Sequence, residues 1–181
     1  MTPAPPGAPT PGANRARAAT DWRRFATMLG LVAMPVFALD QLVKLYIVRR
    51  LRLFEQIDVV PHWLAITYTL NSGAAFSLFA NLGPAMRGLI LDGLAGAAVV
   101  VLGVLLARGA RPPVVSAAFA LIMGGAVGNL LDRVLRGRVV DFIYVHYYSW
   151  SYPVFNLADS AITIGVAIIL LHALFADDAG A

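Results

Sequence analysis

Four long apolar segments constrain the fold of this chain more than any other feature. They lie at about residues 25–48, 84–107, 114–131 and 155–175. Each is close to the roughly 20 residues that a helix needs to cross about 30 Å of hydrocarbon. The chain is 59% hydrophobic and only 13% charged, whereas about a quarter of the residues in a soluble domain are charged. We therefore predict an all-α membrane protein with four transmembrane helices and both termini on one side.

The regions outside these segments are short. Residues 1–21 hold five of the eleven prolines, which is typical of a disordered N-terminal tail. We predict one membrane domain over residues 22–175 and a C-terminal tail over residues 176–181. The positive-inside rule leaves the orientation open, because six basic residues fall on one side of the membrane and eight on the other.

The composition excludes several classes of function. The net charge of +4 is dispersed along the chain, so it suits contact with anionic membrane lipid and not with nucleic acid. The chain has no cysteine, which excludes disulfides, thiol nucleophiles and cysteine-based zinc sites. The three histidines lack the spacing of metal ligands, so we expect no metal site and no cofactor. Gly124, Gly125 and Gly128 indicate close packing between helices, not a phosphate-binding loop.

The segment between the first two apolar runs has the pattern of a strand. Over residues 64–71 large apolar side chains alternate with small or polar ones, which is the period of two expected for a half-buried strand. Val59 and Val60 indicate a partner strand, and Asn71-Ser72-Gly73 indicates a turn. We predict a small antiparallel sheet at the membrane surface.

Polar side chains gather near the ends of three apolar segments, where those spaced three or four residues apart share a helix face. The set comprises Asp40, Lys44, Asn129, Asp132, Arg133, Asn156 and Asp159. In helices that alternate in direction, these ends lie at one face of the membrane, together with the strand segment and Asp141. Carboxylates at a membrane boundary are costly, so Asp141 and Asp159 suggest a pair that shares one proton.

Some of these residues also fit simpler interpretations. Asp40 with Lys44 fits an ion pair at the membrane interface. Arg133 fits a pair with Asp132 or a contact with lipid headgroups. Asp92 lies within the second apolar segment, and the sequence assigns it no role.

Other classes of function compete with an aspartate pair. Asp141 and Asp159 fit an ion or proton path, but a transporter is expected to carry polar groups along the depth of several helices. A serine protease using Ser72 or Ser77 with Lys44 lacks a Gly-x-Ser-x-Gly elbow and a histidine partner. A structural scaffold leaves the clustered polar ends unexplained.

Five short motifs occur in one order along the chain. They are Asp-Gln-Leu-Val-Lys at 40–44, Asn-Ser-Gly-Ala-Ala-Phe at 71–76, Gly-Gly-Ala-Val-Gly-Asn-Leu-Leu-Asp-Arg at 124–133, Val-Val-Asp-Phe at 139–142 and Phe-Asn-Leu-Ala-Asp at 155–159. In this order they resemble the lipoprotein signal peptidase (signal peptidase II) family of bacteria. The resemblance covers roughly residues 22–175, without a departure at the motif positions.

The resemblance implies an aspartyl endopeptidase of the bacterial inner membrane, with both termini in the cytoplasm and the active site near the outer leaflet. Members of the family remove the signal peptide from diacylglyceryl-modified prolipoproteins, cutting before the lipidated cysteine, and the antibiotic globomycin inhibits them. The resemblance implies that Asp141 and Asp159 are the catalytic pair. We expect a monomer.

The same resemblance implies roles for other residues. Those that match the substrate-binding or site-supporting positions are Asp40, Lys44, Asn71, Gly73, Asn129, Asp132, Arg133 and Asn156. The strand segment resembles the extracytoplasmic β-cradle of the family. Residues 135–153 resemble its mobile extracytoplasmic loop, which is expected to close over the site.

Overall fold

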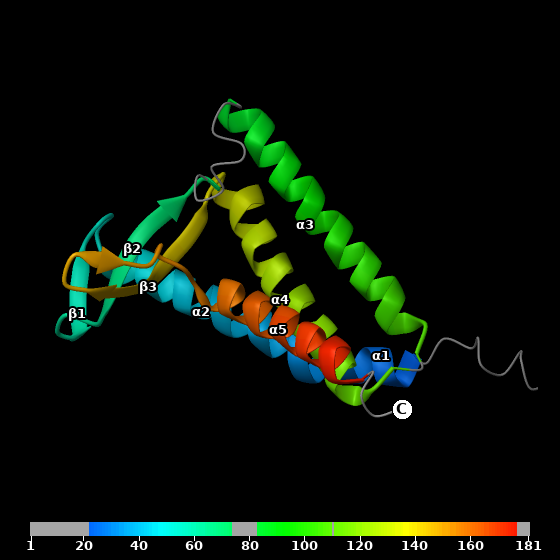
Figure 1. Cartoon of the computed structure of the whole chain (residues 1–181). Helices are drawn as coiled ribbons and strands as arrows, with labels where there is room; N and C mark the ends of the chain where they lie inside the picture. Colours follow the sequence, from blue (N-terminus) through cyan, green and yellow to red (C-terminus); the bar gives the residue numbers. More distant parts are fainter. Residues whose placement is uncertain (1–21, 74–82, 110, 177–181) are drawn as a thin grey trace, which may run out of the picture.

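The computed structural model describes residues 22–73, 83–109 and 111–176, which form four helical spans and a small sheet (Figure 1). The first span is continuous from Trp22 to Arg50 and combines α1 (Trp22–Met28), the π-helical segment η2 (Leu29–Ala33) and α2 (Met34–Arg50). The others are α3 (Pro84–Ala107), α4 (Pro113–Arg136) and α5 (Leu157–Ala176). Within the described residues, four helices are long and apolar enough to cross a membrane, which confirms the predicted segments.

The π-helical segment lies where the first span meets a proline. Pro35 is the second residue of α2, just after η2 ends at Ala33. Proline has no N–H to donate, and its ring clashes with the carbonyl one turn earlier in a regular α-helix. A widened turn before the ring relieves that conflict without breaking the span.

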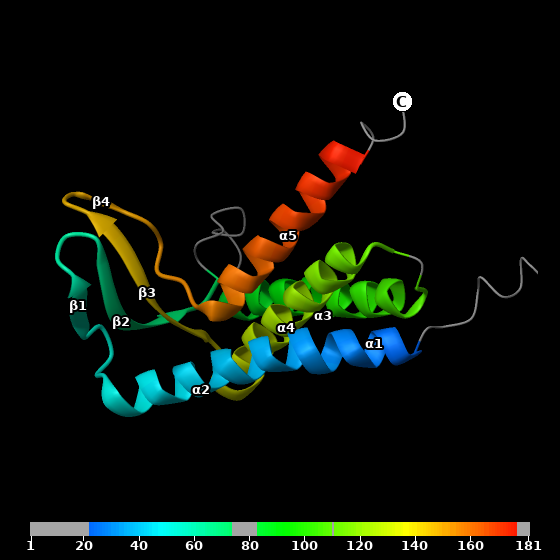
Figure 2. The same cartoon turned by 90° about the horizontal axis from the view of Figure 1, so that it is seen from below.

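Helix α4 is the centre of the bundle (Figure 2), and its glycines allow the neighbouring helices to come close. A Cβ atom on Gly124 would lie 2.5 Å from the carbonyl oxygen of Ala33, and one on Gly125 would lie 2.4 Å from that of Ala158. Real side chains do not fit at these distances, so the close packing predicted from the glycines is confirmed. Larger residues there would push the first span and α5 away from α4.

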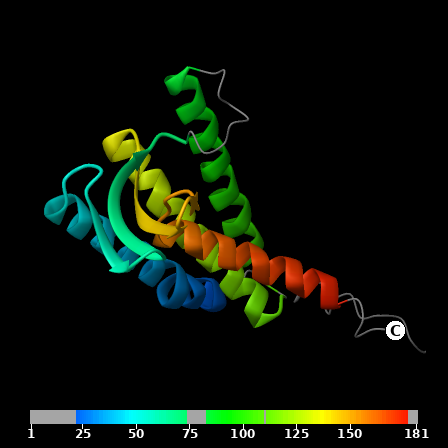
Figure 3. The same ribbon diagram turned by 60° about the vertical axis from the view of Figure 1, so that its left-hand side comes forward.

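The sheet has four antiparallel strands in the order β1-β2-β3-β4. They are β1 (Gln56–Val60), β2 (Leu64–Asn71), β3 (Val139–Tyr147) and β4 (Trp150–Ser151). The sheet lies at one end of the bundle (Figures 1 and 3), and both described ends of the chain lie at the opposite end. The predicted pairing of the segment at 59–60 with that at 64–71 is confirmed.

The prediction of a loop over residues 135–153 is wrong in secondary structure. Most of this segment forms β3 and β4. Its run of β-branched and aromatic residues favours a strand, but the partner that it needs is β2, about 70 residues earlier in the chain. The pairing places Asp141 opposite Thr69 within the sheet. Movement of this segment over the site stays a prediction.

Candidate active site

Asp159 is positioned by the way in which α5 begins. The Asn156 side-chain oxygen accepts a hydrogen bond from the Asp159 N–H (2.9 Å), and Asp159 Oδ2 accepts one from the Asn156 N–H (3.2 Å). This reciprocal arrangement is a capping box, in which two side chains satisfy backbone donors that a helix start leaves free. Asp40 Oδ1 accepts the N–H of Ala158 (3.0 Å). The three-residue spacing of Asn156 and Asp159 therefore caps α5 and fixes the position of the Asp159 carboxylate.

Asp141 lies on β3 and is almost completely buried, with 1% of its surface exposed. Its Oδ2 accepts a hydrogen bond from Asn71 Nδ2 (2.9 Å), and its Oδ1 accepts one from Asn156 Nδ2 (2.7 Å). Asn71 is the last residue of β2. Its own oxygen accepts the N–H of Gly73 (2.8 Å), whose φ of +80° is a conformation that glycine adopts without strain. The turn at Gly73 thus orients Asn71 toward Asp141.

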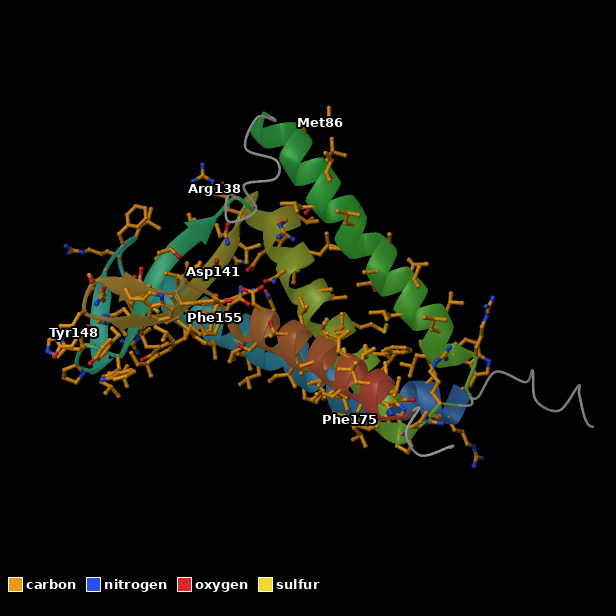
Figure 4. The ribbon with its side chains drawn as sticks, in the orientation of Figure 1. Met86, Arg138, Asp141, Tyr148, Phe155 and Phe175 are labelled. Carbon is orange, nitrogen blue, oxygen red and sulfur yellow. The ribbon has the colours of Figure 1, made fainter. Side chains whose placement is uncertain are left out.

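Asparagine side chains connect the two carboxylates. Asn156 donates to Asp141 through its amide and to Asp159 through its backbone. Asn129 on α4 donates to Asp159 Oδ1 (2.7 Å), and its oxygen accepts a hydrogen bond from Asn156 (3.1 Å). Figure 4 shows Asp141 where the sheet meets the helices, close to Phe155. The structure therefore brings Asp141 and Asp159 into one hydrogen-bonded network.

This environment raises the pKa of Asp141. Burial away from water is the largest cause, and the negative charge of Asp159 adds to it. The hydrogen bonds from Asn71 and Asn156, and the charge of Lys44, act in the opposite direction. The net result raises the pKa of Asp141 from 3.8 to about 6. Two carboxylates so placed are suited to hold one proton between them.

Lys44 is the centre of a buried cluster behind the aspartate pair. Its Nζ contacts Asp40 Oδ2 at 2.7 Å, Asp132 Oδ2 at 2.9 Å and Asn129 Oδ1 at 2.9 Å. An ammonium has three donors, and all three are used. The side chains of Lys44, Asp40 and Asp132 are completely buried. The predicted ion pair between Asp40 and Lys44 is therefore confirmed, and the structure adds that both side chains are buried inside the bundle.

Asp132 has partners other than the one expected. Its carboxylate pairs with Lys44 and with Arg136, one turn further along α4, and also accepts the N–H of Val140 (3.2 Å). Arg133 instead lies 3.5 Å from Asp92 on α3. Arg136 was not among the residues predicted for the site, although its spacing of four residues from Asp132 indicates a shared helix face. The Asp92–Arg133 pair joins two helices, so no local spacing indicates it.

A cavity of about 550 Å³ opens beside Asp159, between α3, α4 and α5. Its polar lining includes Asn71, Asn129, Arg133 and Asp159. Its apolar walls include Leu91, Ala95, Ala98, Ile122, Ala126 and Ile162. A second cavity of about 310 Å³ also has Asp159 in its wall. The site thus presents a carboxylate to a space that is otherwise mostly apolar, which suits a substrate from the membrane.

The described residues also bear on the alternatives. Within them, no group of three or more His, Cys, Asp or Glu residues is placed to hold a metal ion. Lys44 is buried with its donors used, so it is not available as a base for Ser72, while Ser77 lies outside the described residues. The polar network is confined to the sheet end of the bundle. This distribution differs from the polar groups along the membrane depth that a transporter needs.

Comparisons with known proteins agree on one family. The profile of the family described as signal peptidase (SPase) II matches residues 32–175. A lipoprotein signal peptidase of Syntrophotalea carbinolica is 45% identical over 146 residues, which cover 80% of this chain and 89% of that protein. A lipoprotein signal peptidase of Symbiobacterium thermophilum is 34% identical, over 84% of this chain and 99% of that protein.

Two solved structures are also similar to this chain. A bacterial membrane enzyme determined by the in meso method at 1.9 Å resolution aligns with a TM-score of 0.69 and 33% identity, covering 80% of this chain and 90% of that one. A second, at 2.3 Å resolution, aligns with a TM-score of 0.73 and 31% identity, covering 83% of this chain and 90% of that one. Most of this chain therefore shares its fold with solved bacterial membrane enzymes.

Proposed function

Because the chain belongs to the signal peptidase II family of lipoprotein signal peptidases, we propose that it hydrolyses its substrates with Asp141 and Asp159 as an aspartyl pair. The substrates are diacylglyceryl-modified prolipoproteins, and the bond cleaved precedes the lipidated cysteine. One observation carries the proposal: Asn156 bonds to both carboxylates, and one of them, Asp159, lines an apolar cavity. No other pair of carboxylates among the described residues has this position.

The proposed chemistry needs one proton on the pair. The ionised carboxylate takes a proton from a water molecule, which attacks the carbonyl carbon of the scissile bond. The protonated carboxylate donates a hydrogen bond to the carbonyl oxygen as negative charge develops there. The leaving amine then receives a proton from the pair, and the single shared proton is restored. The network does not decide which carboxylate holds it, so the pair titrates as a unit.

The surrounding residues have supporting roles in this proposal. Asn71, Asn129 and Asn156 donate to the carboxylates and hold them in place. The apolar walls from α3, α4 and α5 accommodate the hydrophobic helix of a signal peptide. Fixing both reacting groups in this way removes the cost of orienting them during reaction.

A cleavage assay tests the proposed function. The purified protein in detergent is expected to convert a diacylglyceryl-modified prolipoprotein to a product whose first residue is the lipidated cysteine, and globomycin should block the conversion. The same precursor without the diacylglyceryl group is the matched control and should remain uncut. Cleavage of the unmodified precursor with the lipidated one left intact would contradict the proposal.

The proposed orientation places the sheet outside the cytoplasm and both termini inside, in the inner membrane. Since the chain has no cysteine, single cysteines report topology directly. Tyr148→Cys, at a residue that is 72% exposed at the tip of the sheet (Figure 4), should react with an impermeant maleimide added to intact spheroplasts. Arg108→Cys at the other end should react only after lysis. The opposite result for the two positions would reverse the orientation.

The pKa of Asp141 predicts a pH dependence. Since the pKa of Asp141 is raised to about 6, the pair should lose its shared proton, and kcat/KM should decline, as the pH rises through that value. Asn71→Ala removes a hydrogen bond that lowers the pKa of Asp141. The declining limb should therefore move to higher pH in this variant, whatever its absolute rate. If the declining limb of the kcat/KM profile stays at the same pH in Asn71→Ala, or moves to lower pH, the pKa of Asp141 does not set that limb.

A further inference from the structure

The membrane-spanning part of α3 carries a single ionisable side chain, Asp92, between residues 88 and 107. Its Oδ1 lies 3.5 Å from Arg133 Nε, and the two side chains are 35% and 18% exposed. Within the described residues, this Oδ1 atom is buried and accepts no hydrogen bond. A charged oxygen in that condition is costly, so the pair is not an optimised structural contact.

Arg133 also has N–H donors without a partner among the described residues. A guanidinium offers five N–H donors, and Asp92 is the one partner of Arg133 in the part of the chain that the structure describes. Other cations near the site differ: Lys44 uses all three of its donors, and Arg136 bonds to Asp132. Arg133 lies one helical turn beyond Asn129, and both line the cavity with Asp159. Its free donors are therefore available to a molecule in the cavity.

Arg133 should interact more strongly with a peptide carbonyl oxygen than with Asp92. A partly exposed ion pair without a good hydrogen bond contributes little. A hydrogen bond from a guanidinium to a carbonyl oxygen in a water-poor cavity is stronger. An extended peptide beside the aspartate pair presents such carbonyl oxygens. Exchange of Arg133 from Asp92 to the peptide is then favourable, but the loss of the Asp92 contact reduces the net gain.

We propose that Asp92 is a displaceable counterion, which occupies Arg133 in the empty site and competes with the substrate backbone for it. Asp92 keeps the guanidinium charge compensated at the cavity wall until substrate binds. It is therefore a residue that sets substrate affinity, not a group that takes part in hydrolysis. The inference rests on the proposed function, because it assumes that the cavity receives the peptide.

The test separates substrate affinity from turnover. Asp92→Asn removes the competing charge, so KM for the lipidated precursor should fall about threefold, as expected for loss of a weak ion pair, with kcat unchanged. Asp92→Ser should give the same decrease, and Asp92→Glu should return KM toward the wild-type value. Asp58→Asn is the matched control, because Asp58 is an exposed carboxylate on β1 at the same end of the molecule.

A binding measurement removes the chemistry from the comparison. In the Asp141→Asn background, the uncut lipidated precursor should bind more tightly when Asp92→Asn is added. An unchanged or higher KM in both neutral variants would overturn the inference. Loss of folded protein in both would also overturn it, since Asp92 would then be a structural counterion. Failure of the wild-type protein to cut the lipidated precursor would instead contradict the proposed function.

Discussion

Asp141→Asn and Asp159→Asn are each expected to lower kcat at least about 1,000-fold, because the pair then lacks either the base or the proton donor. Some loss of stability should accompany the loss of activity. Both oxygens of Asp141 accept hydrogen bonds from side-chain amides, and those of Asp159 accept from one amide and one backbone N–H. An Asn amide can accept at only one side and presents an NH₂ group to the other donor.

The stability cost should nevertheless be small, about 1–2 kcal/mol for one mismatched donor. Single-turnover kinetics with the lipidated precursor measures the chemical step, and thermal unfolding in detergent verifies that each variant is folded. Asp58→Asn is the control for a loss of negative charge outside the site. Turnover within tenfold of wild type in either site variant would show that the pair is not catalytic.

Lys44→Met is expected to have the largest effect on stability. Lys44 is the cation between Asp40 and Asp132, and all three side chains are completely buried. Methionine keeps most of the volume but leaves two carboxylates with less compensation, which costs about 3–5 kcal/mol for a broken buried pair. Arg136 still contacts Asp132, so Asp40 is the carboxylate left without a cation among the described residues.

A second substitution should compensate part of the stability lost in Lys44→Met. Adding Asp40→Asn to Lys44→Met removes the uncompensated charge and should recover part of the lost stability, although the amide must still accept the N–H of Ala158. Thermal unfolding midpoints of the two variants in the same detergent make the comparison, with Arg49→Met as a control for an exposed cation on the same helix. A midpoint for Lys44→Met close to that of Arg49→Met would contradict a role for the buried cluster.

The sequence predicted those features that depend on local pattern. The length and composition of the apolar runs predicted the four spans, and the close-packed glycines of α4 were identified from their spacing. The three-residue interval from Asn156 to Asp159 marked a functional helix start, because a capping box is local to the chain. The alternation over residues 64–71 predicted β2 in the same way.

The features that were missed depend on contacts between distant segments. β3 was taken for a loop because its partner strand lies far away in the sequence, and only the pairing makes the segment a strand. The spacing of Asp40 and Lys44 predicted their ion pair, but it does not reveal that Lys44 also contacts Asp132 and Asn129. The sequence left Arg133 with either Asp132 or lipid headgroups as its partner, whereas the folded chain pairs it with Asp92 on another helix.

The aspartate network also has a consequence for the order of biosynthesis. Its members come from the first span, β2, α4, β3 and the start of α5, so Asn156 and Asp159 are the last to be synthesised. Under the proposed mechanism, a nascent chain that ends before α5 holds Asp141 without Asp159 and cannot hydrolyse peptides by this route. The proposed pair is thus complete only after the start of α5 has joined the bundle. Until then, such a chain would leave the precursors that cross the same membrane uncut.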